Sequence, residues 1–104
     1  MAKTLRQYGQ TTLGVWPPPI VEAIYNREAF QAGNLWAEST DYWPIGELPD
    51  RWIARIVNDS PSYIVFSYRT PIAWWSELNG WVVPDVRYSV TTSRHQGFVR
   101  RAVT

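Results

Sequence analysis

The dipeptide Asn79-Gly80 constrains the fold more than any other feature of this sequence. Both of its positions accept a positive φ angle, which the tight turn of a β-hairpin requires. Residues 72–77 and 81–83 flank the dipeptide as the two strands of such a hairpin. Pro84 has no backbone N–H group, so it ends the second strand or confines it to a sheet edge. The sequence therefore predicts an antiparallel hairpin over residues 72–83.

Further strand patterns surround this hairpin. Residues 63–70 and 86–91 alternate between two faces, as half-buried strands do. Residues 52–57 are interpreted as another strand, which the turn-forming residues 58–62 follow, and residues 35–38 as one more. Together with the hairpin they predict an antiparallel sheet of about four or five strands.

Helical patterns lie on either side of these strands in the sequence. The longer one covers residues 20–32 and follows Pro17-Pro18-Pro19, which supplies a proline suited to a first helical turn. Gly33-Asn34 is expected to stop this helix in the left-handed conformation. A short C-terminal helix is predicted over residues 93–102, because its start carries a capping pattern.

These elements predict an α+β protein with one domain over residues 1–104. Residues 1–16 are expected to form an N-terminal arm, with an edge strand at about residues 11–15. No apolar stretch approaches the roughly 18–20 residues that cross a bilayer, and the first residues lack the apolar run of a secretory signal. Without cysteine, neither a disulfide nor a zinc–thiolate site forms. We therefore expect a cytoplasmic protein with no membrane partner.

Two segments of the second half are distinctive, and they read YRTPIAW (residues 68–74) and YSVTTSRHQ (residues 88–96). On these segments, residues 35–104 resemble a family of small uncharacterised proteins of actinobacterial phages, described as a domain of unknown function. The resemblance implies a viral protein that acts in the cytoplasm of a host bacterium. It implies no activity, cofactor or catalytic residue.

The junction between the strand at residues 86–91 and the C-terminal helix is a candidate anion site. A helix start exposes unpaired N–H groups and carries partial positive charge, so it readily holds phosphate or carboxylate. The side chains expected around the anion are Thr91, Thr92, Ser93, Arg94 and His95. The alternative is structural: a hydroxyl caps the helix, Gln96 completes a capping box with Ser93, and Arg94 and His95 are solvated.

Basic residues gather near the end of the chain, although the net charge is only +1. After Asp85 the sequence has four arginines and no acidic residue. Arg100 and Arg101 also suit a helix C-terminus, where cations are stabilised. The C-terminal arginines make nucleic-acid binding the second functional hypothesis. They are Arg87, Arg94, Arg100 and Arg101.

Catalysis has little support in the sequence. His95 is the only histidine, and Ser89 and Ser93 are close to it in the chain. Their spacing supplies neither an orienting carboxylate nor an oxyanion hole. No Gly-rich phosphate loop, metal-ligand cluster or paired-carboxylate motif is present. We therefore expect no enzymatic activity, no cofactor and no metal site.

Seven tryptophans are more than one small core easily hides. Trp74 and Trp75 are adjacent in a strand, so their rings point to opposite faces and at least one is expected to reach solvent or an interface. The alternative is that the second helix or the N-terminal arm covers the outer ring. Exposed Trp with Tyr and Arg is typical of protein-binding hot spots. The leading hypothesis is a non-catalytic module that binds another protein or itself through Trp74, Trp75 and Trp81.

Overall fold

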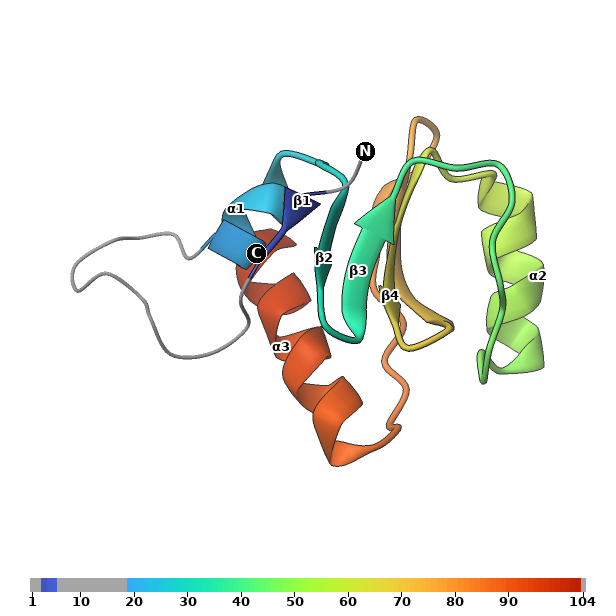
Figure 1. The fold of residues 1–104 in the computed structure, drawn as a ribbon. Helices are drawn as coiled ribbons and strands as arrows, with labels where there is room; N and C mark the ends of the chain where they lie inside the picture. The colour runs from blue at the N-terminus through green and yellow to red at the C-terminus, as the bar shows by residue number, and fades with distance from the viewer. Residues whose placement is uncertain (1–2, 6–18, 104) are drawn as a thin grey trace.

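The chain forms a six-stranded sheet with helices on both faces (Figure 1). The structure is a computed structural model and describes residues 3–5 and 19–103. The edge strand expected at residues 11–15 lies outside these residues. The strands are β1 (Lys3–Thr4), β2 (Phe30–Ala32), β3 (Leu35–Glu38), β4 (Tyr63–Ser67), β5 (Thr70–Ser76) and β6 (Gly80–Val82).

The strands lie in the sheet in their sequence order, β1 to β6. Every neighbouring pair is antiparallel except β1 and β2, which are parallel. The α+β class is confirmed, but the expectation of a purely antiparallel sheet of four or five strands is wrong. Two strands were missed because β1 has two residues and β2 three, too few to display alternation.

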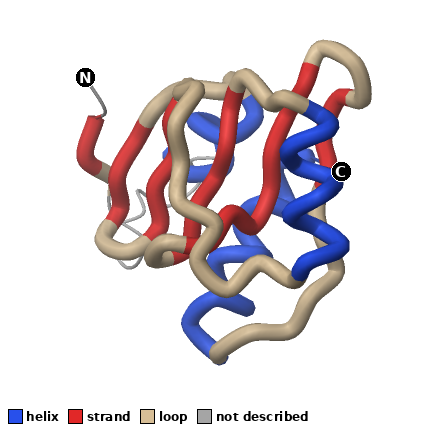
Figure 2. Tube along the Cα trace, turned by 90° about the vertical axis from the view of Figure 1, so that its right-hand side faces the viewer, coloured by secondary structure: helices blue, strands red, loops and turns tan. Residues whose placement is uncertain are grey.

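Three helices cover the sheet, namely α1 (Pro19–Tyr25), α2 (Asp50–Asp59) and α3 (Val90–Val103). In Figure 1, α1 and α3 lie together on one face of the sheet and α2 lies on the other. Figure 2 looks onto the α2 side and shows that this helix lies over the end of the sheet far from β1. In the described part of the chain, no helix is long and apolar enough to cross a membrane.

The side chains of β4 explain why both faces of the sheet are covered. Its five residues are all buried. Tyr63 and Val65 belong to the core beneath α1 and α3, whereas Ile64 and Phe66 belong to the core beneath α2. Because alternate residues of a strand point to opposite faces, an apolar run of this kind needs cover on both sides.

The helix predicted over residues 20–32 is wrong beyond Tyr25, where α1 ends. Arg27 takes the left-handed conformation, with φ 55°, just after the helix. The chain then forms β2 at residues 30–32, with its outer residues buried and its central residue exposed. Gly33-Asn34 turns the chain between β2 and β3 instead of ending a helix. Over so short a segment, the apolar pattern fitted a helix and a strand equally well.

The strand predicted over residues 52–57 is also wrong, because these residues lie within α2. The buried and half-buried positions of this helix follow the spacing i, i+1, i+4, i+7, which is that of one helical face. The exposed positions between them are Ala54, Arg55, Val57 and Asn58. The residues of the inner face are Trp52, Ile53, Ile56 and Asp59.

Other predicted strands have mixed outcomes. The strand at residues 35–38 and a hairpin at residues 72–83 are confirmed. The tight turn centred on Asn79-Gly80 is not: the loop is residues 77–79, Gly80 pairs with Ser76 as the first residue of β6, and of the two only Gly80 has a positive φ angle. Residues 63–70 do not form one strand, because Tyr68-Arg69 turns the chain between β4 and β5. Residues 86–91 are not a strand: residues 83–89 have no regular structure and α3 starts at Val90, not at the predicted residue 93.

Candidate functional site

Trp75 and Trp81 lie side by side on the sheet face that carries α1 and α3. They are directly paired across β5 and β6, and both are partly buried against the core beneath these helices. The Trp81 ring meets Tyr63 edge-on, with ring centroids 5.9 Å apart. Both tryptophans line an open groove of about 460 Å³, which we call the aromatic groove. Its other lining residues are Tyr25, Asn26, Arg27, Ala102 and Val103.

Among the described residues, Arg27 is the only charged one that lines the aromatic groove. The central carbon of its guanidinium lies 4.1 Å from the centroid of the Trp75 ring, which is a cation–π contact. The neighbouring Glu28 carboxylate is paired instead with the Lys3 ammonium at 2.8 Å. Within residues 3–5 and 19–103, Arg27 has no ion pair. Its guanidinium therefore retains donors for a carboxylate outside this part of the chain.

Trp74 does not contribute to the aromatic groove, which corrects the expectation of one surface formed by three tryptophans. Its side chain is fully buried on the α2 face, where it meets Trp52 edge-on with ring centroids 6.2 Å apart. The Nε1 of Trp74 donates a 2.9 Å hydrogen bond to the buried carboxylate of Asp59. Asp59 also accepts hydrogen bonds from Arg55 and Asn79. This network joins α2 to the β5–β6 hairpin.

The predicted capping box of Ser93 and Gln96 is not formed, because α3 begins three residues earlier. The actual cap is Ser89, whose Oγ accepts a hydrogen bond from the backbone N–H of Thr92 at 3.1 Å. Ser93 is exposed, whereas Gln96 is buried and donates to the carbonyl of Val86. At the start of α3, the Ser89 hydroxyl thus accepts a backbone N–H hydrogen bond of the kind that a bound anion was predicted to accept.

His95 is fully buried, so the expectation that it is solvated is wrong. Its Nδ1 lies 2.7 Å from the Ser67 Oγ, which is 2.9 Å from the Thr92 Oγ1. The Ser89 Oγ donates to Thr92 at 3.2 Å. In one consistent arrangement, Ser89 donates to Thr92, Thr92 donates to Ser67, and Ser67 donates to an unprotonated Nδ1 of His95. Each hydroxyl then both donates and accepts a hydrogen bond. Burial lowers the pKa of His95, which favours this neutral form.

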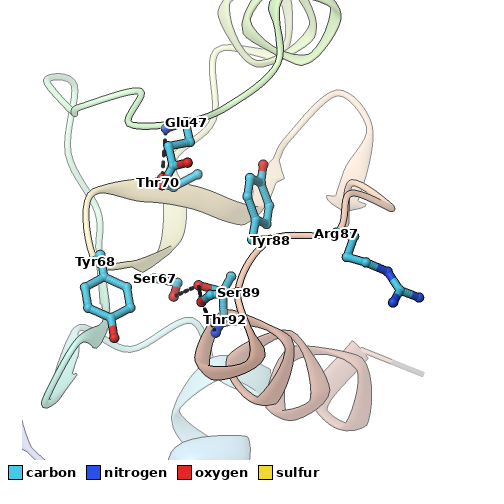
Figure 3. A pocket seen from close by; sticks show the side chains of 8 residues that line it. All are labelled: Glu47, Ser67, Tyr68, Thr70, Arg87, Tyr88, Ser89 and Thr92. Carbon is cyan, nitrogen blue, oxygen red and sulfur yellow. Dashed lines mark hydrogen bonds between the residues drawn. The ribbon is translucent and has the colours of Figure 1, made fainter.

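A second cavity, of about 430 Å³, lies above these hydroxyls, and we call it the polar pocket. Figure 3 shows Ser67, Ser89 and Thr92 linked on one side, with Glu47 and Thr70 on the other and Arg87 directed away. The backbone N–H of Glu47 donates to the Thr70 Oγ1 at 2.9 Å. The hydroxyls nearest α3 are occupied with one another.

Residues 22–100 match a protein family described as a family of unknown function (DUF8033). The chain belongs to this family. No match was found among curated proteins or among solved structures. The family match assigns no source or cellular location, so a phage origin and a cytoplasmic location stay predictions.

The DUF8033 region contains most of the site residues expected from the sequence but does not bring them together. Thr92 and His95 face the sheet, whereas Arg94 and Arg101 are exposed on the outer side of α3. Arg100 lies near Asp85, with nitrogen and oxygen 4.0 Å apart. Arg87 is exposed and Thr91 is half-buried. The predicted anion site is therefore divided between a buried network and a basic helix surface.

Several site residues of this DUF8033 chain escaped the sequence analysis. Arg27 was assigned to the middle of a helix, and its position over Trp75 depends on the early end of α1. Ser67 was assigned to one face of a strand, but its hydrogen bond to His95, 28 residues further along the chain, was not predicted. No local pattern signals either contact. The described residues hold no cluster of three or more potential metal ligands.

Proposed function

We propose that this DUF8033 protein is a non-catalytic protein-interaction module that binds another protein, or a second copy of itself, through the aromatic groove. The observation that carries the proposal is the cross-strand pair Trp75 and Trp81 at an open groove, with the Arg27 guanidinium stacked on one of the rings. Trp, Tyr and Arg are the residues that most often dominate the binding energy of protein interfaces.

The exposure of the groove residues supports the same proposal. Tyr25 is 67% exposed, although it is a large aromatic residue at the end of α1. Aromatic rings with few rotatable bonds lose little conformational entropy when a partner covers them. The groove also lies where the helices α1 and α3 end, so a partner segment can reach the rings without displacing either helix.

The burial of the Ser67–His95 hydroxyl–imidazole pair supports a non-catalytic role. Ser67 lines the polar pocket but is only 1% exposed, and its Oγ is already hydrogen-bonded to Thr92 and to the fully buried His95. A serine nucleophile also needs an oxyanion hole open to the substrate. The hydrogen bonds of Ser67 instead tie α3 to β4.

Selection from a random-peptide display library on the immobilised full chain tests the proposal. Peptides that bind the wild type should lose about tenfold or more in affinity for Tyr25→Ala and Trp81→Ala, because both variants remove ring surface from the groove. Leu78→Ala is the matched control, because Leu78 is 76% exposed and lies outside the groove. Sedimentation of the same variants measures self-association. The proposal is overturned if neither peptide binding nor self-association depends on the two ring residues.

The outer side of α3 supports a second candidate function, binding of nucleic acid. Arg94 and Arg101 are exposed and seven positions apart, which places them on one side of the helix, and α3 contains no acidic residue. Phosphate contacts by arginine weaken steeply as salt rises. Anisotropy titrations with short labelled single- and double-stranded DNA test this candidate. Arg94→Ala/Arg101→Ala should abolish any salt-dependent binding, and Tyr25→Ala should leave it unchanged.

A further inference from the structure

The aromatic groove also indicates the chemistry of its partner. We infer that the groove accepts an acidic segment, in which an Asp or Glu carboxylate binds the Arg27 guanidinium and an adjacent apolar side chain covers Trp75 and Trp81. This inference rests on the proposed function, because it names the partner class for the same groove.

The first argument is charge complementarity. Arg27 is the only charged residue among the described ones that line the groove, and the acidic residue next to it is paired with Lys3. In the described part of the chain, no carboxylate forms an ion pair with the Arg27 guanidinium. A carboxylate from a partner therefore meets a cation without displacing an ion pair of the described residues.

The second argument is geometry. The central carbon of the guanidinium lies 4.1 Å from the centroid of the Trp75 ring, so the contact with this ring fixes where the cation lies in the groove. A planar fork held in this way matches the two oxygens of a carboxylate. The left-handed backbone at Arg27, φ 55°, is uncommon for a residue with a side chain, and it places this arginine at the groove just after α1.

The third argument is the apolar surface beside the cation. Trp81 and Tyr25 line the groove without any acidic neighbour among the lining residues. A purely acidic segment would leave these rings exposed to water, whereas an apolar residue next to the acid buries them. The expected partner segment thus has an apolar residue next to an acidic one, or alternates acidic and apolar residues.

The experiment uses the tightest peptide from the display selection and a copy in which every Asp and Glu is replaced by Asn and Gln. Both are titrated against the full-length wild type, Arg27→Gln and Arg51→Gln, with folding checked by circular dichroism. Arg51 is exposed on α2, on the opposite face of the sheet, so Arg51→Gln removes the same charge away from the groove.

We expect the acidic peptide to lose about tenfold in affinity for Arg27→Gln and less than about twofold for Arg51→Gln. The neutral copy should bind wild type and Arg27→Gln equally. The inference is overturned if peptides that depend on Trp81 show no enrichment of Asp or Glu, or if the two arginine variants bind the acidic peptide alike. Failure of the proposed function looks different, because then no selected peptide depends on Tyr25 or Trp81.

Discussion

Trp74 and Trp75 are adjacent in the chain, lie on opposite faces of the sheet and differ in how far they are buried. On the α2 face, Trp74 is fully buried and hydrogen-bonded to Asp59. On the α1–α3 face, Trp75 is only partly buried and lines a groove between the ends of two helices. Both residues belong to β5, so the strand does not explain the difference. The difference comes from the helices: α2 covers Trp74 completely, whereas α1 and α3 end beside Trp75 and leave it accessible to a partner.

The polar groups that join helices to the sheet differ in the same way. Asp59 on α2 accepts hydrogen bonds from three side chains, and one of them is the cation Arg55. His95 on α3 bonds to Ser67 at the end of β4, and burial lowers its pKa, which favours the neutral imidazole. A buried carboxylate needs donors and a counter-charge, whereas a neutral imidazole needs only hydrogen bonds. The two faces are therefore expected to respond differently to mutation and to pH.

The largest expected contrast is between alanine substitutions on the two faces. Trp74→Ala should lower the free energy of unfolding by about 3–5 kcal/mol, because it empties an enclosed site and removes a donor to Asp59. Trp81→Ala should cost about 1–2 kcal/mol, because water already reaches part of this ring. Urea unfolding followed by circular dichroism measures both losses. Equal losses would mean that the groove face is as closed as the α2 face, which removes the basis of the proposed interface.

Sequence patterns predicted those parts of the fold in which a local rule decides the structure. Asn79-Gly80 predicted a hairpin, and the hairpin is present, although only Gly80, with φ 68°, takes the positive φ angle that the turn rule assigns to both residues. The strand at residues 52–57 failed because Trp, Ile and Val favour strands by propensity, whereas the helical spacing of the buried positions emerges only once α2 covers the sheet. The helix at residues 20–32 failed because residues 30–32 pair as a strand, with the distant β1 on one side and with β3, the next segment of the chain, on the other.

The candidate site was less predictable, because its contacts join distant parts of the chain. Opposite orientations of Trp74 and Trp75 follow from the strand alone, but nothing local indicates that Trp74 is the enclosed one. The partner of Trp75 is Arg27, which a different element supplies. Likewise, the capping role moved from Ser93 to Ser89, because α3 starts before the pattern that predicted it.

A smaller effect is expected from pH. His95 is the only histidine, and burial lowers its pKa in the folded state below the ordinary value of 6.5. The unfolded chain therefore binds the proton more tightly, so stability is fully present above about pH 6.5 and is lost as the pH falls toward the folded pKa. Each tenfold difference in proton affinity corresponds to about 1.4 kcal/mol.

Urea unfolding at pH values between about 7.5 and 5 measures this loss, because most carboxylates titrate at lower pH. His95→Gln is the control and should flatten the profile over this range. An unchanged slope in that variant would mean that another group, not the imidazole on the α3 face, is responsible.

The smallest effect is expected where the α2 face contains a donor without an acceptor. Among the described residues, the buried Nε1 of Trp52 has no hydrogen-bond partner, whereas the Nε1 of Trp74 donates to Asp59. Trp52→Phe should therefore change the free energy of unfolding by less than about 1 kcal/mol, and Trp74→Phe should lower it by about 2 kcal/mol. The two substitutions remove the same atoms, but Trp52 is partly buried and Trp74 fully buried, so Trp74→Phe also loses more packing than Trp52→Phe. Similar losses in the free energy of unfolding would show that packing, rather than the hydrogen bond to Asp59, holds Trp74 in the core. The contrast between the two faces would then depend only on how completely the helices cover the tryptophans.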